Sequence, residues 1–250
     1  MSIQACAELV HRGDPDRFLA TMTAPLAARE ILLPIYAFNL EVARAPWVTK
    51  EAMIAEMRLQ WWRDALEEIA TGATVRRHEV VTPLALVLDG EAARLLDGVV
   101  TARSWDIYSD AFDDEAAFEA HIEATSASLM WVAARALGAK QESVFRAIGY
   151  AAGLASWFRA IPELENQGRK PLVDGRTSAV AALAEGALAR LATVTSVEAA
   201  GRPAALAAWQ GRALLKQAAR EPARVAEGSL GTSGFARHSS LMLARLRGRV

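Results

Sequence analysis

The sequence predicts an all-α fold, and three observations carry that prediction. Apolar residues recur at intervals of three and four, which is the helical period, and no stretch shows convincing strand alternation. Alanine-rich runs dominate, and Ala, Leu, Glu and Arg are strong helix formers. The chain has 250 residues, which suits one large domain. We therefore expect a single helical domain over residues 1–250.

Helical patterns follow one another along the chain, with Gly, Pro and Asp between them as start and stop signals. They cover residues 3–11, 16–22, 26–44, 50–69, 83–88, 91–103, 113–137, 142–160, 177–192, 202–220 and 235–249. Pro34 falls inside the third pattern, so we expect a kink or a tight break there. Pro162 is expected to end the helix that begins at Glu142. The last pattern, 235–249, is a short basic helix.

One helix shows a regular apolar series. Between the expected cap at Thr49 and the terminating Gly72, apolar residues fall at successive steps of four. They are Met53, Met57, Trp61, Ala65 and Ile69. We expect them to form one buried stripe.

Composition and charge exclude several classes of protein. Hydrophobic residues make up 52% and charged residues 23%, which are ordinary values for a globular protein. The net charge of -1 gives no global attraction to nucleic acid, so we expect no such partner. Cys6 is the one cysteine, which excludes an internal disulfide and a cysteine-based zinc site. No run approaches the roughly 20 apolar residues of a membrane span. We expect a cytoplasmic protein, with peripheral membrane contact as a second possibility.

Several short strings along the chain form a recognisable set. They are Asp16-Arg17-Phe18-Leu19, Arg29, Tyr36-Ala37-Phe38, Arg58-Leu59-Gln60-Trp61-Trp62-Arg63-Asp64, Ile148-Gly149-Tyr150-Ala151, Arg159, Gly168-Arg169 and Pro171-Leu172. Together these strings resemble the squalene/phytoene synthase family. The resemblance extends to about Val173 and implies an isoprenoid-synthase helical bundle around a central cavity. It also implies a reaction, since active members join two prenyl diphosphates head to head.

The same resemblance implies a magnesium site, and here the chain departs from the family. In active members, aspartates four residues apart lie on one helix face, and two such motifs hold Mg²⁺ and diphosphate. The corresponding positions in this chain are Ala43, Trp47, Ala160 and Leu164. We therefore expect no catalytic residues, no metal ligands and no cofactor.

The expected function is accordingly that of a catalytically degenerate family member. It would act as an isoprenoid- or lipid-binding protein, or as a respiratory-complex assembly factor, by resemblance to the complex I assembly factor branch of the family. The alternative is an active head-to-head prenyl transferase, which would require Mg²⁺. Only Glu41 and Glu163 remain near the two motifs to support it.

A set of candidate cavity or ligand-binding residues follows from the resemblance. It consists of Arg29, Tyr36, Asn39, Glu41, Trp61, Arg63, Arg159 and Glu163. The expected ligand is a prenyl diphosphate or a lipid, and the sequence identifies no protein partner. Each arginine in the set could attract an anionic head group, although an ion pair is the commoner role. Of the adjacent Trp61 and Trp62, one is expected in the core and the other at an edge or in the cavity wall.

Other motifs have plainer explanations. Asp106, Asp110, Asp113 and Asp114 imitate a metal motif, but capping and solvation explain them better. His121 is expected to be satisfied or exposed. Gly149 and Gly153 indicate close packing or a smooth cavity wall.

The basic C-terminal segment has two possible roles. It carries Arg237, Arg245, Arg247 and Arg249 beside Leu241, Leu243 and Leu246. Such a helix could dock on an anionic membrane surface. Packing on the body of the protein is the slightly favoured alternative.

Overall fold

The computed structural model describes residues 3–108 and 110–247, and the regular structure of that part of the chain is helical, without strands. The predicted all-α class is confirmed. The elements are α1 (Ile3–Gly13), α2 (Pro15–Met22), α3 (Leu26–Arg44), η1 (Ala45–Trp47), α4 (Ala52–Thr71), α5 (Val81–Leu84), α6 (Gly90–Ala102), η2 (Arg103–Asp106), α7 (Glu115–Ile122), η3 (Glu123–Ala127), α8 (Ser128–Ala136), α9 (Glu142–Asn166), α10 (Thr177–Ala192), α11 (Arg202–Ala205), η4 (Leu206–Ala208), α12 (Gly211–Arg220), α13 (Ala223–Ala226) and α14 (Gly234–Arg247).

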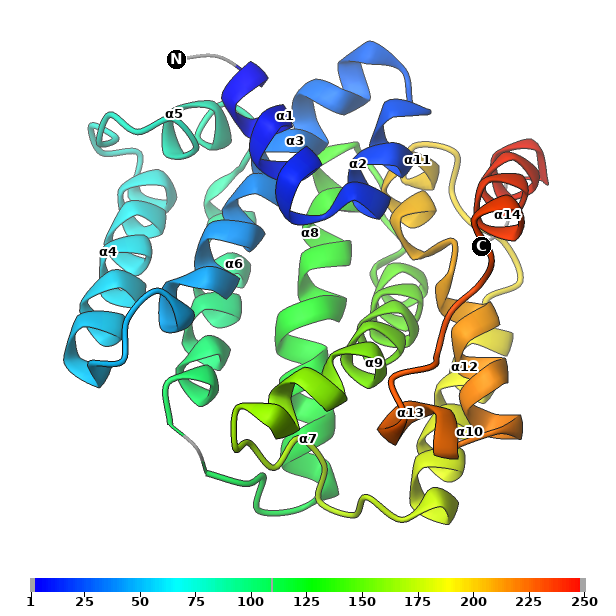
Figure 1. Cartoon of the computed structure of the whole chain (residues 1–250). Coiled ribbons are helices and arrows are strands. Elements are labelled where there is room, and N and C mark those ends of the chain that lie inside the picture. Colours follow the sequence, from blue (N-terminus) through cyan, green and yellow to red (C-terminus); the bar gives the residue numbers. More distant parts are fainter. Residues whose placement is uncertain (1–2, 109, 248–250) are drawn as a thin grey trace.

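The longer helices stand side by side in a row. α4 packs on α6, α6 on α8, α8 on α9, and α9 on both α10 and α12 (Figure 1). The N-terminal helices α1, α2 and α3 pack on one another, and α1 and α2 lie at the top of the view in Figure 1. α3 also contacts α8, so the N-terminal helices are connected to the middle of the helix row.

One continuous hydrophobic core holds these elements together. It runs from Cys6 in α1 to Leu230, beyond α13. Its largest fully buried side chains include Phe38, Phe118 and Phe145, which come from three different helices. Burial of such aromatic side chains dominates the energetics of a core.

Polar residues cap the helix N-termini, and glycines end helices, where the sequence indicates. The carboxylates of Asp14, Asp89 and Asp114 each accept a backbone N–H in the first turn of α2, α6 and α7. Gly72 ends α4 with a φ of 70° and Gly138 follows α8 with a φ of 93°, a left-handed conformation that favours glycine. Asp114 is therefore a cap, as predicted.

The tight break expected at Pro34 and the helix end expected at Pro162 are both absent, while the kink at Pro34 stays a prediction. Pro34 lies within the continuous helix α3, and Pro162 lies within α9, which extends to Asn166. Each proline removes one backbone donor and disfavours the helix locally. Pro34 is buried among core residues, and Ile161 and Leu164 beside Pro162 are also buried, so packing compensates.

The predicted buried stripe of α4 is wrong in its first half. Met53 and Met57 are 67% and 66% exposed, while the buried face is Ala55, Leu59, Trp62, Ala65 and Leu66. Steps of four drift by about 40° each in a helix of 3.6 residues per turn, so a long series leaves the core face. The buried residues are instead separated by steps of four, three, three and one.

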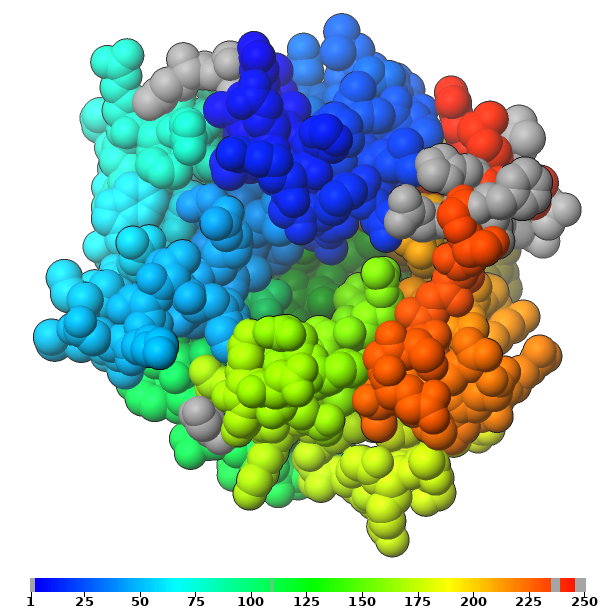
Figure 2. All heavy atoms as spheres, viewed as in Figure 1, coloured from blue at the N-terminus to red at the C-terminus, as the bar shows by residue number. Residues whose placement is uncertain are grey.

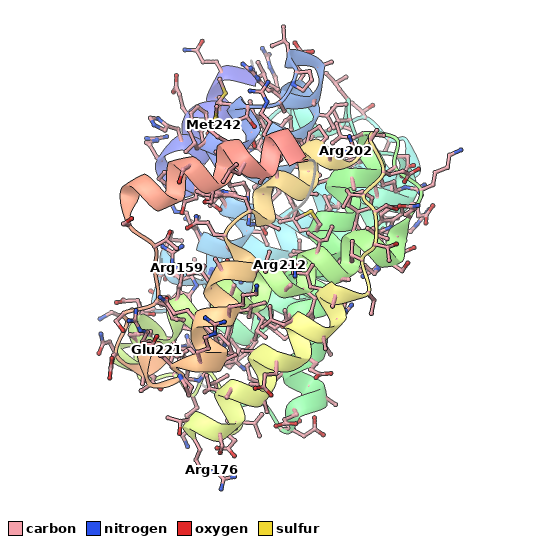
Figure 3. All side chains as sticks on the ribbon, turned by 90° about the vertical axis from the view of Figure 1, so that its right-hand side faces the viewer. Arg159, Arg176, Arg202, Arg212, Glu221 and Met242 are labelled. Carbon is pink, nitrogen blue, oxygen red and sulfur yellow. The ribbon has the colours of Figure 1, made fainter. Side chains whose placement is uncertain are left out.

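The C-terminal part also differs from expectation. The single helix predicted over 202–220 is divided into α11, η4 and α12. The basic helix α14 begins at Gly234, and residues 248–250 lie outside the described part of the chain. Leu241 is 3% exposed and packs with Trp209 and Ala20, so α14 lies on the body of the protein (Figure 3), as the favoured alternative predicted. The side chains of Arg237, Leu246, Arg247 and Arg249 are outside the description.

None of the described helices combines the length and the apolar character needed to cross a membrane.

Candidate ligand-binding pocket

A pocket of about 160 Å³ lies at the centre of the molecule. Figure 2 shows the surface hollowed between the N-terminal helices and the C-terminal half of α9. Its lining comes from α2, α3, η2, η3, α8, α9 and η4. The lining residues are Arg17, Tyr36, Asn39, Arg103, Thr125, Ser126, Leu129, Met130, Gly149, Ala152, Gly153, Ser156 and Ala207. Two arginines and no carboxylate belong to this set.

Arg17 and Tyr36 form one wall of the pocket. The Nε of Arg17 lies 3.2 Å from a carboxylate oxygen of Asp14, and its guanidinium carbon lies 5.0 Å from the centre of the Tyr36 ring. Tyr36 is 2% exposed, and burial raises the pKa of its hydroxyl to about 12. Among the described residues, neither Nη1 of Arg17 nor Oη of Tyr36 has a hydrogen-bond partner. Unsatisfied buried polar atoms of this kind are uncommon and need an explanation.

Arg103 contributes a second cation, from η2. Its Nη1 donates to Asp106 over 3.3 Å, while its buried Nε finds no acceptor within the described chain. Asp106 is 3% exposed, and burial raises its pKa although Arg103 and Arg169 act in the opposite direction. The Asp106 carboxylate is thus an ion-pair partner rather than a solvated residue of the turn.

Two glycines of α9 allow the floor of the pocket to form. A Cβ on Gly153 would lie 2.3 Å from Cβ of Ser126, and one on Gly149 would lie 2.6 Å from Cβ of Met130. Ser126 belongs to η3, a π-helical turn between α7 and α8. π-helical turns occur often at functional sites. The predicted close packing at Gly149 and Gly153 is confirmed, and both residues line the pocket.

Of the predicted candidates on α3, two line the pocket and two do not. Tyr36 and Asn39 are buried and line it. Arg29 lies near the start of α3, where its Nε donates to the Ala24 carbonyl over 2.8 Å. Glu41 is half-buried on α3 and is not among the lining residues.

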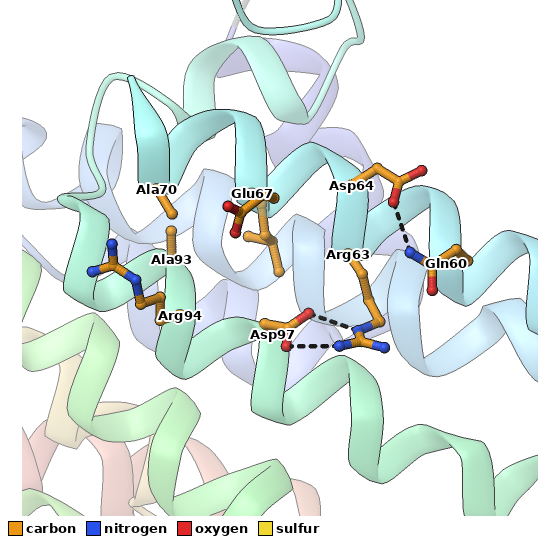
Figure 4. A pocket seen from close by; sticks show the side chains of 9 residues that line it. Gln60, Arg63, Asp64, Glu67, Ala70, Ala93, Arg94 and Asp97 are labelled. Carbon is orange, nitrogen blue, oxygen red and sulfur yellow. Dashed lines mark hydrogen bonds and ion pairs between the residues drawn. The ribbon is translucent and has the colours of Figure 1, made fainter. Parts of the chain in front are cut away.

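The candidates from α4 lie elsewhere. Trp62 is the core member of the tryptophan pair and packs edge-on against Phe38. Trp61 is half-buried, and its ring centre lies 4.9 Å from the guanidinium carbon of Arg76. Arg63 pairs with Asp97 over 2.8 Å in a surface groove between α4 and α6 (Figure 4). The structure therefore separates Trp61 and Arg63 from the central pocket.

The two candidates near the end of α9 are exposed. Nη1 of Arg159 lies 3.8 Å from a carboxylate oxygen of Asp16 (Figure 3). Arg159 follows the pocket-lining Ser156 by one turn of α9. Glu163 accepts a hydrogen bond from Gln167. Neither side chain lines the pocket.

His121 differs from its predicted environment. It is 6% exposed within a cluster of aromatic rings that includes Trp105, Phe112 and Trp157, and its Nε2 has no partner in the described part of the chain. Burial and then the charge of Arg103 lower the His121 pKa to about 3. The expectation of a satisfied or exposed histidine is wrong, because the surrounding rings exclude water without offering an acceptor.

Arg17 and Arg103 are the charged pocket residues that the candidate set lacked. Arg17 belongs to one of the recognised strings, so its position in the motif was available as a signal. Arg103 lies in a short turn after α6, and no local pattern distinguishes it from a surface arginine.

Comparison with known proteins identifies the family of this chain. The family model of squalene/phytoene synthase matches residues 10–173. The chain belongs to the squalene/phytoene synthase family. A solved dehydrosqualene synthase in complex with ligand shares the fold, with a TM-score of 0.79 and 14% identity over 98% of this chain and 95% of that one.

Curated relatives within the family carry a different name. The human protein named NADH dehydrogenase (ubiquinone) complex I, assembly factor 6, is 26% identical over 172 residues, which are 63% of this chain and 48% of that protein. Its Drosophila melanogaster homologue is 29% identical over 167 residues, 63% of this chain and 50% of that protein. This chain thus spans about half the length of these relatives.

The residues at the positions where the resemblance places the family's metal ligands do not fit magnesium. Ala43 and Ala160 offer no ligand, Leu164 is 8% exposed, and Trp47 lies against Arg169. Within the described residues, no three His, Cys, Asp or Glu side chains come together as metal ligands. Magnesium requires hard oxygen ligands, which these side chains lack.

Proposed function

We propose that this protein is a catalytically degenerate squalene/phytoene synthase that works as an assembly factor for a respiratory complex and binds a ligand in its central pocket. One observation carries the proposal. The family fold is retained around a pocket, while Ala43, Trp47, Ala160 and Leu164 stand where the family's aspartates would. Ionisation of an allylic diphosphate needs its charge neutralised, and these side chains cannot hold the required cations.

The names of the curated relatives support the choice of an assembly role. They are named for assembly of complex I, and each matches 63% of this chain. The alignment covers only about half of those proteins. That this chain assists the assembly of a respiratory complex is therefore a proposal.

An assembly factor needs a surface that contacts its client, and this chain has an apolar surface at the start of α4. Trp47, Val48, Met53, Ile54 and Met57 are between 37% and 67% exposed, from η1 to the second turn of α4. Exposed apolar patches often mark interaction sites. Methionine suits such a surface because its side chain is flexible and polarisable.

The test is a deletion of the gene in its own host, followed by native gels that resolve respiratory complex I. We expect less assembled complex, restored by the wild-type chain but not by Met53→Ser/Met57→Ser. Both positions are exposed, so the double variant should fold normally. Normal assembly in the deletion strain would contradict the assembly role. Magnesium-dependent release of diphosphate from a prenyl diphosphate would instead support the alternative, an active prenyl transferase.

We also propose a cytoplasmic location with peripheral membrane contact through α14. Met242 and Leu243 are 56% and 46% exposed on this helix, and Arg245 is exposed beside them. That combination suits an anionic lipid surface. A chain that ends at Gly234 should lose binding to anionic liposomes, whereas unchanged flotation would contradict the proposed contact.

A further inference from the structure

We infer that a groove between α9, α10 and α12 binds a fatty acid, with the alkyl chain against α9 and α10 and the carboxylate at Arg212 of α12. The groove measures about 460 Å³ and shares no lining residue with the central pocket. Figure 3 looks onto α10 and α12 and labels Arg212. This site is additional to the central pocket named in the proposed function.

The greater part of the groove wall is apolar. Ile148 of α9 and Leu191 of α10 line it and are 1% and 4% exposed. Val194 and Val197, in the segment after α10, are half-buried beside them and pack against the core. Ligand sites are typically lined by apolar side chains, with a few polar groups that fix the orientation of the ligand. An alkyl chain in this groove would remove apolar surface from water.

Arg212 supplies the charge in the lining of the groove. Its half-buried side chain forms no hydrogen bond or ion pair within the described part of the chain, and no carboxylate lines the groove. Arg212 lies in the first turn of α12, where no acidic residue is present and no side chain caps the helix. The positive end of the helix dipole disfavours a cation at this position. A bound anion would therefore be stabilised both by the arginine and by the helix.

The polar edge of the groove suits a carboxylate better than a phosphate. A carboxylate accepts two parallel N–H bonds from one guanidinium, and Arg212 balances its single charge. A phosphate carries more negative charge, and the described lining offers no second cation. Thr195 and Ser196 add exposed hydroxyls that donate to no described residue, so they are available to the same carboxylate.

The volume of the groove limits the length of the chain. Its 460 Å³ is three times the roughly 150 Å³ of an engineered cavity that holds one benzene molecule. By that measure the groove has room for an alkyl chain of about twelve carbons. Acetate would leave the apolar wall uncovered, so the chain and the carboxylate are both needed for tight binding.

The test is calorimetric titration of the full chain with dodecanoate below its micelle concentration. We expect saturable binding that is about tenfold weaker in Arg212→Gln, because a charge-assisted pair of hydrogen bonds is lost. Arg220→Gln is the matched control, since this exposed arginine lies on the same helix outside the groove, and it should bind as the wild type does. Wild-type affinity in Arg212→Gln would overturn the inference.

Dodecanol separates the contribution of the carboxylate from that of the chain. The wild type should bind dodecanol about tenfold more weakly than dodecanoate, and Arg212→Gln should reduce this difference to less than about twofold. Dodecyl phosphate that binds more tightly than dodecanoate would refute the assignment of a fatty acid. Acetate that binds as tightly as dodecanoate would refute it as well.

Thr195→Glu adds a carboxylate to a lining that has none. Thr195 is exposed, so the variant should fold normally. It should bind dodecanoate about tenfold more weakly, because the new charge repels the ligand and competes for Arg212. Thr195→Gln has the same size without the charge and should bind within about twofold of the wild type. Equal affinities of the two variants would contradict a head group at this edge.

Two other results would place the ligand or the groove in a different role. Loss of dodecanoate binding in Arg17→Gln but not in Arg212→Gln would locate the ligand in the central pocket. A dimer in sedimentation that dissociates in Thr195→Glu would show that a second copy of the chain covers the groove. Either result would overturn the inference and leave the proposed assembly role untouched.

Discussion

The guanidinium carbon of Arg169 lies 5.0 Å from the centre of the Trp47 ring, so a cation covers this partly exposed indole. Nη2 of Arg169 also donates to the Asp106 carbonyl over 2.7 Å. These contacts join the loop after α9 to η1 and η2.

Trp47→Ala should therefore destabilise the protein by about 1 kcal/mol, because a partly exposed cation–π contact and some apolar burial are lost. Urea unfolding followed by circular dichroism measures the change. Leu86→Ala is the control, since Leu86 is 84% exposed, and it should stay within about 0.5 kcal/mol of the wild type. Equal stability of the two variants would show that the Arg169 contact contributes nothing.

The glycines of α9 give a prediction with an internal contrast. Gly153→Ala places a Cβ 2.3 Å from Cβ of Ser126, so α9 and η3 must separate, and we expect a loss of about 2 kcal/mol or more. Gly98→Ala in α6 meets nothing within 4 Å and should stabilise by about 0.5–1 kcal/mol. Chemical unfolding of the two variants checks both signs. A harmless Gly153→Ala would contradict the close approach described for these helices.

His121 should make stability depend on pH. Its pKa is lowered to about 3 in the folded protein, below the ordinary 6.5, so between these values the unfolded chain binds a proton that the folded chain does not. Stability should accordingly fall as the pH falls, with a loss of about 2 kcal/mol between pH 7.5 and pH 5. Urea unfolding across this range should show a smaller loss in His121→Phe. Parallel pH profiles would rule out the neutral buried imidazole.

Leu241 should anchor the C-terminal helix. Leu241→Asp places a charge between Trp209 and Ala20, and we expect α14 to detach because an unpaired buried charge is strongly unfavourable. Trypsin should then cleave at Arg245 faster than in the wild type. Met242→Asp, at a 56% exposed neighbour, should leave the cleavage rate unchanged. If both variants are cut at the same rate, Leu241 does not hold the helix.

Much of the fold could be predicted from the sequence because helical period and capping are local properties. Asp114 and Gly72 are examples, since each terminus depends on residues within one turn. The errors arose where tertiary packing overrides local preference. Pro34 and Pro162 remain inside helices because buried neighbours compensate for the lost donor, and the face of α4 follows the core rather than a series of fours.

The candidate site was less predictable, because it is assembled from distant elements. Tyr36 and Asn39 could be identified from a motif on α3, but Arg63 and Glu163 occupy exposed positions on other faces. Arg103 lines the pocket from η2, the short turn after α6, beside residues of α2, α3 and α9 that are far away in the sequence. No local sequence pattern indicates which arginine will have a buried N–H group without a hydrogen-bond partner.

The central claim is that the family pocket persists without the acids that hold cations. Calorimetric titration of farnesyl diphosphate into the full chain, once with Mg²⁺ and once with EDTA, tests it most directly when diphosphate release is assayed in the same samples. The account predicts weak or undetectable binding that Mg²⁺ changes by less than about twofold, with no diphosphate released. Binding that requires Mg²⁺ and is followed by release of diphosphate would contradict it.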